Sequence, residues 1–477
     1  MGEPMSPQTL LSTLIAWPVL GAVVTWVFGR ASHDTARRVA LVAALGQVLL
    51  SAGVTFAYVT TGLTGKGIPG SFWFLVADGL SLPFVCLTAV LGVVAVCASW
   101  NVEESPGAHL GLLLLLVAMV TGVFLAGDLV LFYVFWEAVL VPMYFLIGVW
   151  GHENRKHAAA KFFVYTFAGS AFMLLGILFA VYATRQVRID LALAVGLRPA
   201  LEPVVFWLLA IGMLVKIPVV PFHTWLPDAH TEAPTAGSVL LAGVLLKMGG
   251  YGLLRLAVPI APHAAAQAGP VLMGLGIAGI VYGSLMALAQ SDLKRLVAYS
   301  SVAHMGFVTL AIGVGTPLAR AAAVLGMVSH GLVSALLFLL VGTLGEAAGT
   351  RDVDSFGGVA TRAPRMGAAL TLAFLASAGL PALSGFPGEA LAVLETFGRA
   401  GWWAAFAALG VVLSAAYGTW TLRRVAFGPS GTAAVEDLGG GIAVSAALLC
   451  VGIVALGVWP QVLVGLVEPV LATLGGR

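Results

Sequence analysis

The feature that most constrains this chain is a series of apolar runs, each about as long as a lipid bilayer is thick. A transmembrane helix needs about 20 apolar residues, and charges, glycines and prolines divide the sequence into fourteen such runs. The runs are continuous, whereas the strands of a transmembrane β-barrel alternate polar and apolar residues. We therefore predict fourteen helical spans, at residues 9–28, 38–59, 79–98, 108–126, 128–149, 161–183, 203–222, 235–256, 270–289, 296–314, 320–345, 367–397, 401–422 and 441–470.

The composition supports a membrane protein and excludes several other classes. Only 9% of the 477 residues are charged, against about 25% in a soluble protein. The net charge of +2 gives no basic surface for nucleic acid. The three cysteines form no C-x-x-C pair, so neither a metal site nor an iron–sulfur cluster is encoded. No phosphate-binding loop motif is present. We expect an all-α polytopic membrane protein that contacts lipid and no nucleic acid.

The basic residues predict the orientation of the spans. When residues at span edges are assigned to the nearest loop, loops after odd-numbered spans hold 13 of the 23 lysines and arginines, including Lys294, and the other loops hold 8, including Arg255. Because positive loops stay in the cytoplasm, the odd loops are expected there and both termini outside. Only Lys216 and Lys247 remain inside spans, and no arginine is expected in a span interior.

Four charged residues lie in the interiors of predicted spans, away from the span ends, namely Glu137, Lys216, Lys247 and Glu389. A charge at the bilayer centre costs at least about 2.5–3.5 kcal/mol on insertion scales, so such residues usually mark an ion or proton path. Lysine suits this role because it can release its proton, whereas arginine does not deprotonate in proteins. The alternative is a structural helix module that holds static ion pairs.

An internal repeat is indicated by two similarly spaced pairs of residues. Asp128 opens the fifth span and Pro218 breaks the seventh, whereas Asp292 precedes the tenth and Pro381 breaks the twelfth. A proline removes a helix hydrogen bond, and a broken span is tolerated where protein or water satisfies the backbone. Because the units are five spans apart, they form two inverted five-helix repeats, each with a broken helix. The expected domains are 1–107 (helices 1–3), 108–256 (first repeat), 257–424 (second repeat) and 425–477 (C-terminal helix).

Four segments carry a resemblance to a known family. They are 132–144 (FYVFWEAVLVPMY), 216–235 (KIPVVPFHTWLPDAHTEAPT), 243–252 (GVLLKMGGYG) and 292–306 (DLKRLVAYSSVAHMG). The chain resembles the antiporter-like proton-channel subunits of respiratory NADH–quinone oxidoreductase, most closely the type called chain M, or chain 4 in mitochondria. The segment GFPGE at 385–389 also points to this type, because sister chains carry lysine at the position of Glu389.

The resemblance implies a proton relay. Glu137 and Lys216 would form the charge pair of an input half-channel, Lys247 would connect the halves, and Glu389 would end the output half. Three histidines match positions that the family places along the polar axis, namely His223, His304 and His330. From its place in the sequence, His230 is expected near a helix end, as a cap or a mouth residue. Pro387 departs from the family's pattern and leaves the backbone course beside Glu389 open.

The resemblance also implies where the chain works. It would be a subunit of a proton-translocating oxidoreductase in a bacterial inner membrane, next to the sister chains L and N. The NADH, FMN, iron–sulfur clusters and quinone would belong to the complex, with no cofactor, redox centre or nucleotide site in this chain. Two alternatives share these motifs: a subunit of a multi-subunit Na⁺/H⁺ antiporter, and the membrane arm of an ion-pumping hydrogenase.

Overall fold

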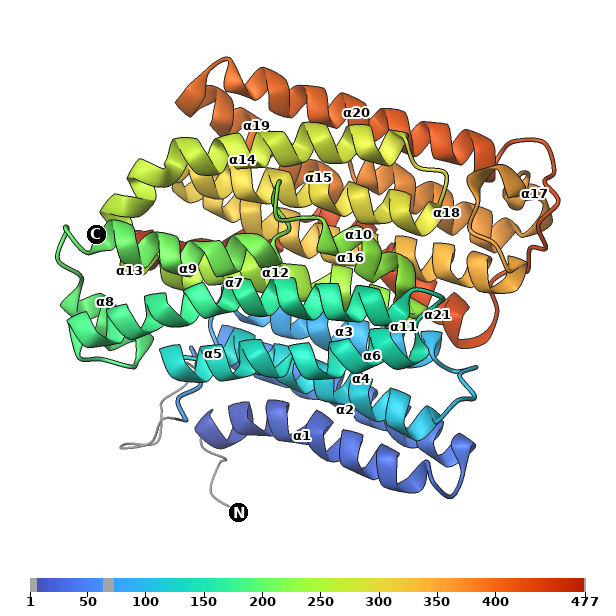
Figure 1. Ribbon diagram of the computed structural model, residues 1–477, viewed down its shortest axis with the longest axis horizontal. Helices are drawn as coiled ribbons and strands as arrows, with labels where there is room; N and C mark the ends of the chain where they lie inside the picture. The colour runs from blue at the N-terminus through green and yellow to red at the C-terminus, as the bar shows by residue number, and fades with distance from the viewer. Residues whose placement is uncertain (1–6, 63–72, 476–477) are drawn as a thin grey trace.

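The computed structural model describes residues 7–62 and 73–475, which fold into a bundle of long helices lying side by side (Figure 1). In Figure 1 the chain begins with α1 at one edge of the bundle and reaches α20 at the opposite edge. The first helices are α1 (Pro7–Phe28), α2 (His33–Thr61), α3 (Leu82–Ala98), α4 (Pro106–Leu125), α5 (Leu129–Ala138), α6 (Leu140–Trp150), α7 (Arg155–Thr184), α8 (Ile189–Val195), α9 (Glu202–Lys216) and α10 (Trp225–Glu232).

The next helix is continuous from Thr235 to Ile260, and its most apolar stretch is completely buried. Two π-helical turns interrupt its α-helical geometry, and Lys247 lies between them. Such π-turns inside α-helices occur frequently at functional sites. The parts of this helix are α11 (Thr235–Leu240), η1 (Leu241–Leu245), α12 (Leu246–Gly252), η2 (Leu253–Ala257) and α13 (Val258–Ile260).

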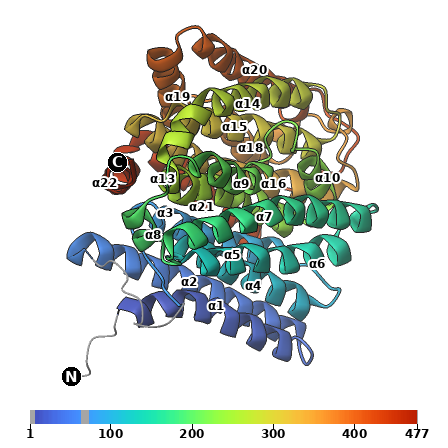
Figure 2. The ribbon, with the colours of Figure 1, turned by 60° about the vertical axis from the view of Figure 1, so that its left-hand side comes forward.

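The rest of the chain completes the bundle. Its helices are α14 (Pro262–Leu288), α15 (Leu293–Val314), α16 (Pro317–Ala348), η3 (Val353–Ser355), α17 (Val359–Arg362), α18 (Pro364–Ser377), α19 (Gly385–Ala400), α20 (Trp403–Val425), α21 (Gly440–Val458) and α22 (Gln461–Gly475). Figure 2 shows α22 at the edge of the bundle, beside the C-terminus.

Eleven helices of the described residues are long and apolar enough to cross a membrane. The predicted span at 79–98 corresponds to the shorter helix α3. The predicted spans at 203–222 and 367–397 are interrupted, because α9 ends at Lys216 and α18 ends at Ser377 before the next helix begins. The predicted last span is divided by Pro460, which separates α21 from α22.

Aspartates fix the starts of two helices at opposite ends of the bundle. Asp128 accepts hydrogen bonds from two backbone N–H groups of α5, and Asp292 accepts one from α15. Each is also paired by a backbone bridge, Asp128 with Arg188 and Asp292 with Asp352, and the partners are 60 residues apart in both pairs. Helix α8 follows the first bridge and α17 lies beyond the second, at the two ends of the bundle in Figure 1.

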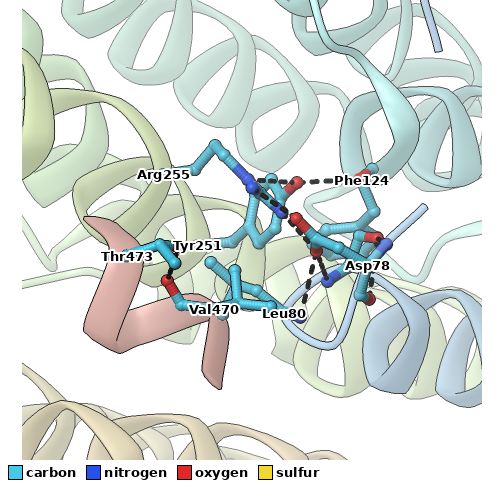
Figure 3. Close-up of polar contacts among 8 residues, drawn as sticks. Asp78, Leu80, Phe124, Tyr251, Arg255, Val470 and Thr473 are labelled. Carbon is cyan, nitrogen blue, oxygen red and sulfur yellow. Dashed lines mark hydrogen bonds and ion pairs between the residues drawn. The ribbon is translucent and has the colours of Figure 1, made fainter. Parts of the chain in front are cut away.

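The prediction that no arginine lies inside a span is wrong. Arg255 belongs to η2 and is buried, with its guanidinium bound to both carboxylate oxygens of Asp78 at 2.6 and 2.7 Å (Figure 3). Its Nε donates to the hydroxyl of Tyr251 at 3.1 Å, and that hydroxyl donates to the carbonyl of Phe124 at 2.8 Å. The partner carboxylate comes from a segment 177 residues away, so the sequence pattern around Arg255 gives no sign of the pair.

Candidate functional site

A line of polar side chains begins at Lys247, in the middle of the fully buried helix. Its side chain is 0% exposed, and its Nζ lies 2.5 Å from Nδ1 of His330 on α16. The same Nζ also donates to the carbonyl of Ala242, in the π-turn η1. The wide turn therefore supplies a backbone acceptor for the buried ammonium group.

The line continues from His330 to α15 and α19. The rings of His330 and His304 are 5.7 Å apart between their centroids. Nδ1 of His304 lies 2.7 Å from a carboxylate oxygen of Glu389, and its Nε2 lies 2.9 Å from the hydroxyl of Ser377 and 3.0 Å from that of Tyr417. The structure thus joins four of the predicted residues, which come from four different helices.

Glu389 ends this line beside a small cavity. Its second carboxylate oxygen has no hydrogen-bond partner in the part of the chain that the structure describes, and the residue lines a cavity of about 20 Å³ together with His304 and His330. A cavity of that volume holds about one water. Pro387 lies in the first turn of α19, where the backbone N–H has no partner within the helix, so the helix carrying Glu389 remains regular.

Glu137 and Lys216, the other predicted charge pair, act on each other electrostatically but are not hydrogen-bonded. Lys216 ends α9 and is 1% exposed, and its Nζ has no hydrogen-bond partner among the described residues. The ammonium group lies over the rings of Trp136 and Phe162, at 5.5 and 5.6 Å from their centroids, which provides cation–π stabilisation. Glu137 follows Trp136 on α5, and the charges of Glu137 and Lys216 act on each other.

The two lysine-bearing helices touch, although their lysines are not bonded. A Cβ atom at Gly249 would lie 2.6 Å from the carbonyl of Met213, which shows how closely α12 and α9 approach. The absence of a side chain at Gly249 allows the two backbones to approach this closely.

His223 is not brought into the same line. Its buried ring packs 4.9 Å from the ring of Tyr282 and 6.4 Å from that of Tyr299, and Lys161 is the cation whose charge acts on it. Its Nδ1 has no hydrogen-bond partner among the described residues. His223 therefore belongs to the interruption between α9 and α10, separate from the line that ends at Glu389.

Sequence reasoning did not predict the deep burial of two titratable residues, Lys294 and His230, although His230 does lie near the end of α10 as expected. Lys294, counted as a loop residue, lies in the first turn of α15 and is almost completely buried, with its Nζ donating to the carbonyl of Ala233 at 2.7 Å. His230 is 0% exposed, and neither of its ring nitrogens has a partner in the described part of the chain. The position of Lys294, two residues after the helix-starting Asp292, was the available signal.

Comparison with known protein families decides the class of this chain. The family model described as "NADH:quinone oxidoreductase/Mrp antiporter, TM" matches residues 126–415, which include the whole line from Lys247 to Glu389. The chain belongs to this family. The predicted resemblance is thereby confirmed.

Relatives within this NADH:quinone oxidoreductase/Mrp antiporter family cover most of the chain. NADH-quinone oxidoreductase subunit M of Pseudomonas aeruginosa is 42% identical over 455 residues, 88% of each chain. That of Rhodobacter capsulatus is 39% identical and covers 98% of this chain and 96% of its own. A chain of respiratory complex I from Thermus thermophilus superposes with a TM-score of 0.86 at 32% identity, over 96% of this chain and all of that one.

The fold extends to a more distant complex. A chain of the archaeal membrane-bound sulfane sulfur reductase superposes with a TM-score of 0.89 at 24% identity, over 98% of this chain and 97% of that one. At this identity the comparison shows the shared fold alone. The two chains therefore share one helical framework.

Proposed function

We propose that this chain is the proton-translocating, M-type membrane subunit of an NADH–quinone oxidoreductase. The observation that carries the proposal is the buried line from Lys247 through His330 and His304 to Glu389, with contacts of 2.5 and 2.7 Å at its two ends. Lysine, histidine and glutamate can each accept and release a proton, so such a line can act as a relay. NADH, flavin, iron–sulfur clusters and quinone are handled by other subunits, and no metal-binding cluster occurs among this chain's described residues.

In the proposed mechanism, Glu137 controls whether Lys216 holds a proton. A buried ammonium group is costly without a partner, so approach of the carboxylate loads Lys216 and its retreat favours release toward Lys247. Breaking a buried pair costs about 3–5 kcal/mol, whereas moving one charge against 100 mV takes about 2.3 kcal/mol. The pair is separated in this structure, where two aromatic rings and not the carboxylate contact the Lys216 side chain.

The proposed topology has fourteen crossings. It adds α3 and the two interrupted pairs, α9 with α10 and α18 with α19, to the eleven long apolar helices. Two inverted repeats, 108–256 and 257–424, are supported by the matching aspartate caps and bridges, which lead to α8 and α17 at opposite ends of the bundle. The segments 1–107 and 425–477 then flank the repeats.

The proposed surroundings follow from the names of the relatives, which are subunits of NADH-quinone oxidoreductase. Other subunits of the same complex, in particular the sister chains L and N, are the proposed partners. The proposed location is the bacterial inner membrane, with the loops after odd-numbered spans in the cytoplasm and both termini outside.

Removing the central amine tests this proposal. In inverted membrane vesicles, Lys247→Ala should abolish NADH-driven proton uptake while the complex still assembles, because the relay loses its middle carrier. Lys156→Ala, which changes an exposed lysine on α7, is the matched control and should pump normally. Normal pumping by the Lys247→Ala complex would contradict the relay. Purification without flavin and iron–sulfur subunits would instead favour the Na⁺/H⁺ antiporter alternative.

A further inference from the structure

A large polar cavity lies away from the proposed relay. Its volume is about 680 Å³, and it opens between the loop before α7, the start of α15 and the end of α16. We call it the vestibule. Its lining includes the charged or polar residues His152, Asn154, Glu232, Lys294, Glu346 and Arg351. A cavity of this volume and polarity holds many waters.

Lys294 lies at the buried edge of the vestibule. Its Nζ donates to the carbonyl of Ala233, and the negative charges of Glu346 and Glu232 act on it. Glu346 accepts a hydrogen bond of 2.5 Å from the hydroxyl of Thr235, at the start of the helix that also carries Lys247. A residue that lines the vestibule is therefore hydrogen-bonded to the helix that carries Lys247.

His230 lies between the vestibule and Lys247. Its ring is stacked on that of Phe338, with centroids 4.2 Å apart and planes at 13°, and the charges of both Lys294 and Lys247 act on it. Neither ring nitrogen has a hydrogen-bond partner within residues 7–62 and 73–475. Leaving a buried polar group unsatisfied is costly, so water is the expected partner of this imidazole.

Positions along helix α16 give the approximate distance between the vestibule and Lys247. It carries His330, which contacts Lys247, Phe338, which stacks on His230, and Glu346, which lines the vestibule. Eight residues separate each of these positions from the next, which corresponds to about 12 Å along an α-helix. Because His230 stacks on Phe338, it lies about 12 Å along this helix from both His330 and Glu346. About three or four waters at hydrogen-bond spacing would bridge each of these two distances.

We propose that Lys294 and His230 form a second proton path, which connects the vestibule directly to Lys247 at the centre of the relay. In it a hydronium ion in the vestibule protonates the neutral amine of Lys294, which passes the proton through water to His230. His230 then gives up the proton on its other nitrogen toward the neutral amine of Lys247. One proton moves in each step and no other reactant is needed. The path rests on the proposed function, since it supplies the same central lysine.

Replacement of the unpaired imidazole tests the path in the intact complex. His230→Phe keeps an aromatic ring on Phe338 but cannot carry a proton. We expect the number of protons pumped per NADH oxidised to fall at least twofold in inverted vesicles, at unchanged amounts of complex. The matched control is His109→Phe, since His109 is also buried and packs against Trp150 but lies outside this path. An unchanged ratio in His230→Phe would overturn the inference.

The lysine provides an independent test. Lys294→Arg keeps the charge and a donor for the carbonyl of Ala233, but an arginine does not release its proton. It should lower the proton-to-NADH ratio as His230→Phe does, whereas a purely structural ion pair would tolerate the change. A normal ratio in Lys294→Arg would count against the path.

A chemical test covers the case in which these variants do not assemble. Asn154→Cys would be made in a background that lacks Cys86, Cys97 and Cys450, and the assembled complex would be labelled with a cationic methanethiosulfonate. The control is Ala434→Cys, on an exposed loop, labelled in the same way. The added positive charge in the vestibule should reduce pumping by at least twofold, and an anionic reagent should reduce it less. Normal pumping after complete cationic labelling would overturn the inference.

These outcomes separate the two proposals. If Lys247→Ala abolishes pumping and His230→Phe leaves it normal, the relay stands and the vestibule path is wrong. If Lys247→Ala pumps normally, the proposed function itself is wrong.

Discussion

Removal of the carboxylate that faces Arg255 should loosen the helix that carries Lys247. In Asp78→Ala the guanidinium of Arg255 loses both charge-assisted hydrogen bonds, at 2.6 and 2.7 Å, and keeps only its bond to Tyr251 (Figure 3). Because Arg255 is buried, its charge remains without a neutralising partner. Removing one member of a buried ion pair costs about 3–5 kcal/mol.

This loss of free energy can be converted into a change in how often the helix around Arg255 opens locally. Since about 1.4 kcal/mol corresponds to a factor of ten in an equilibrium constant, the opened state of this region should gain about 100-fold to 4,000-fold in population. Amide hydrogen exchange in the assembled complex reports such openings. Amides of the η2 segment, Leu253–Ala257, should exchange faster by a factor in that range, whereas amides of α20 should be unaffected.

A double-mutant cycle decides whether the ion pair is the cause. Arg255→Met alone strands the Asp78 carboxylate, but that carboxylate still accepts backbone hydrogen bonds from Leu80 and Ser81. The combined Asp78→Ala/Arg255→Met variant leaves no unpaired buried charge at this pair, and its η2 amides should exchange more slowly than those of Asp78→Ala alone. If the two single effects simply add in the double variant, the electrostatic reasoning is refuted.

Three further predictions follow from the structure. Lys216→Arg should keep the cation over Trp136 but abolish NADH-driven pumping in vesicles, because arginine holds its proton; normal pumping would exclude a loading role for Lys216. Burial, followed by the charges of Lys294 and Arg351, lowers the pKa of His152, in the loop before α7, to about 4. Protonation therefore favours unfolding, so heat stability of the complex should fall as the pH drops from about 6.5 toward 4. The decline should be smaller in His152→Asn, and an equal decline in both would contradict this origin. Glu202 accepts backbone hydrogen bonds from His263 and Ala264 at the start of α14. Glu202→Ala should cost about 0.5–2 kcal/mol in local stability there, measured by amide exchange.

Most of the helical framework could be predicted from the sequence, because the bilayer imposes a simple length requirement on each apolar run. The starts of α5 and α15 were also visible, since Asp128 and Asp292 are residues that cap helix N-termini. The π-turns on either side of Lys247 were not visible. Their geometry depends on packing and on the acceptor that Ala242 offers to the lysine, and apolar periodicity carries no information about either.

The sequence by itself determined which charged groups must be kept from lipid, because each costs free energy in hydrocarbon wherever its partners come from. It therefore singled out Glu137, Lys216, Lys247 and Glu389, and the family resemblance implied a relay that also includes His223, His304 and His330. Only the tertiary structure decided which of them meet. It joined Lys247 to Glu389 through two histidines, left Lys216 on aromatic rings, and paired Arg255 with Asp78. Such partnerships depend on contacts between residues far apart in the chain, and spacing along the sequence fixes only neighbours on the same helix.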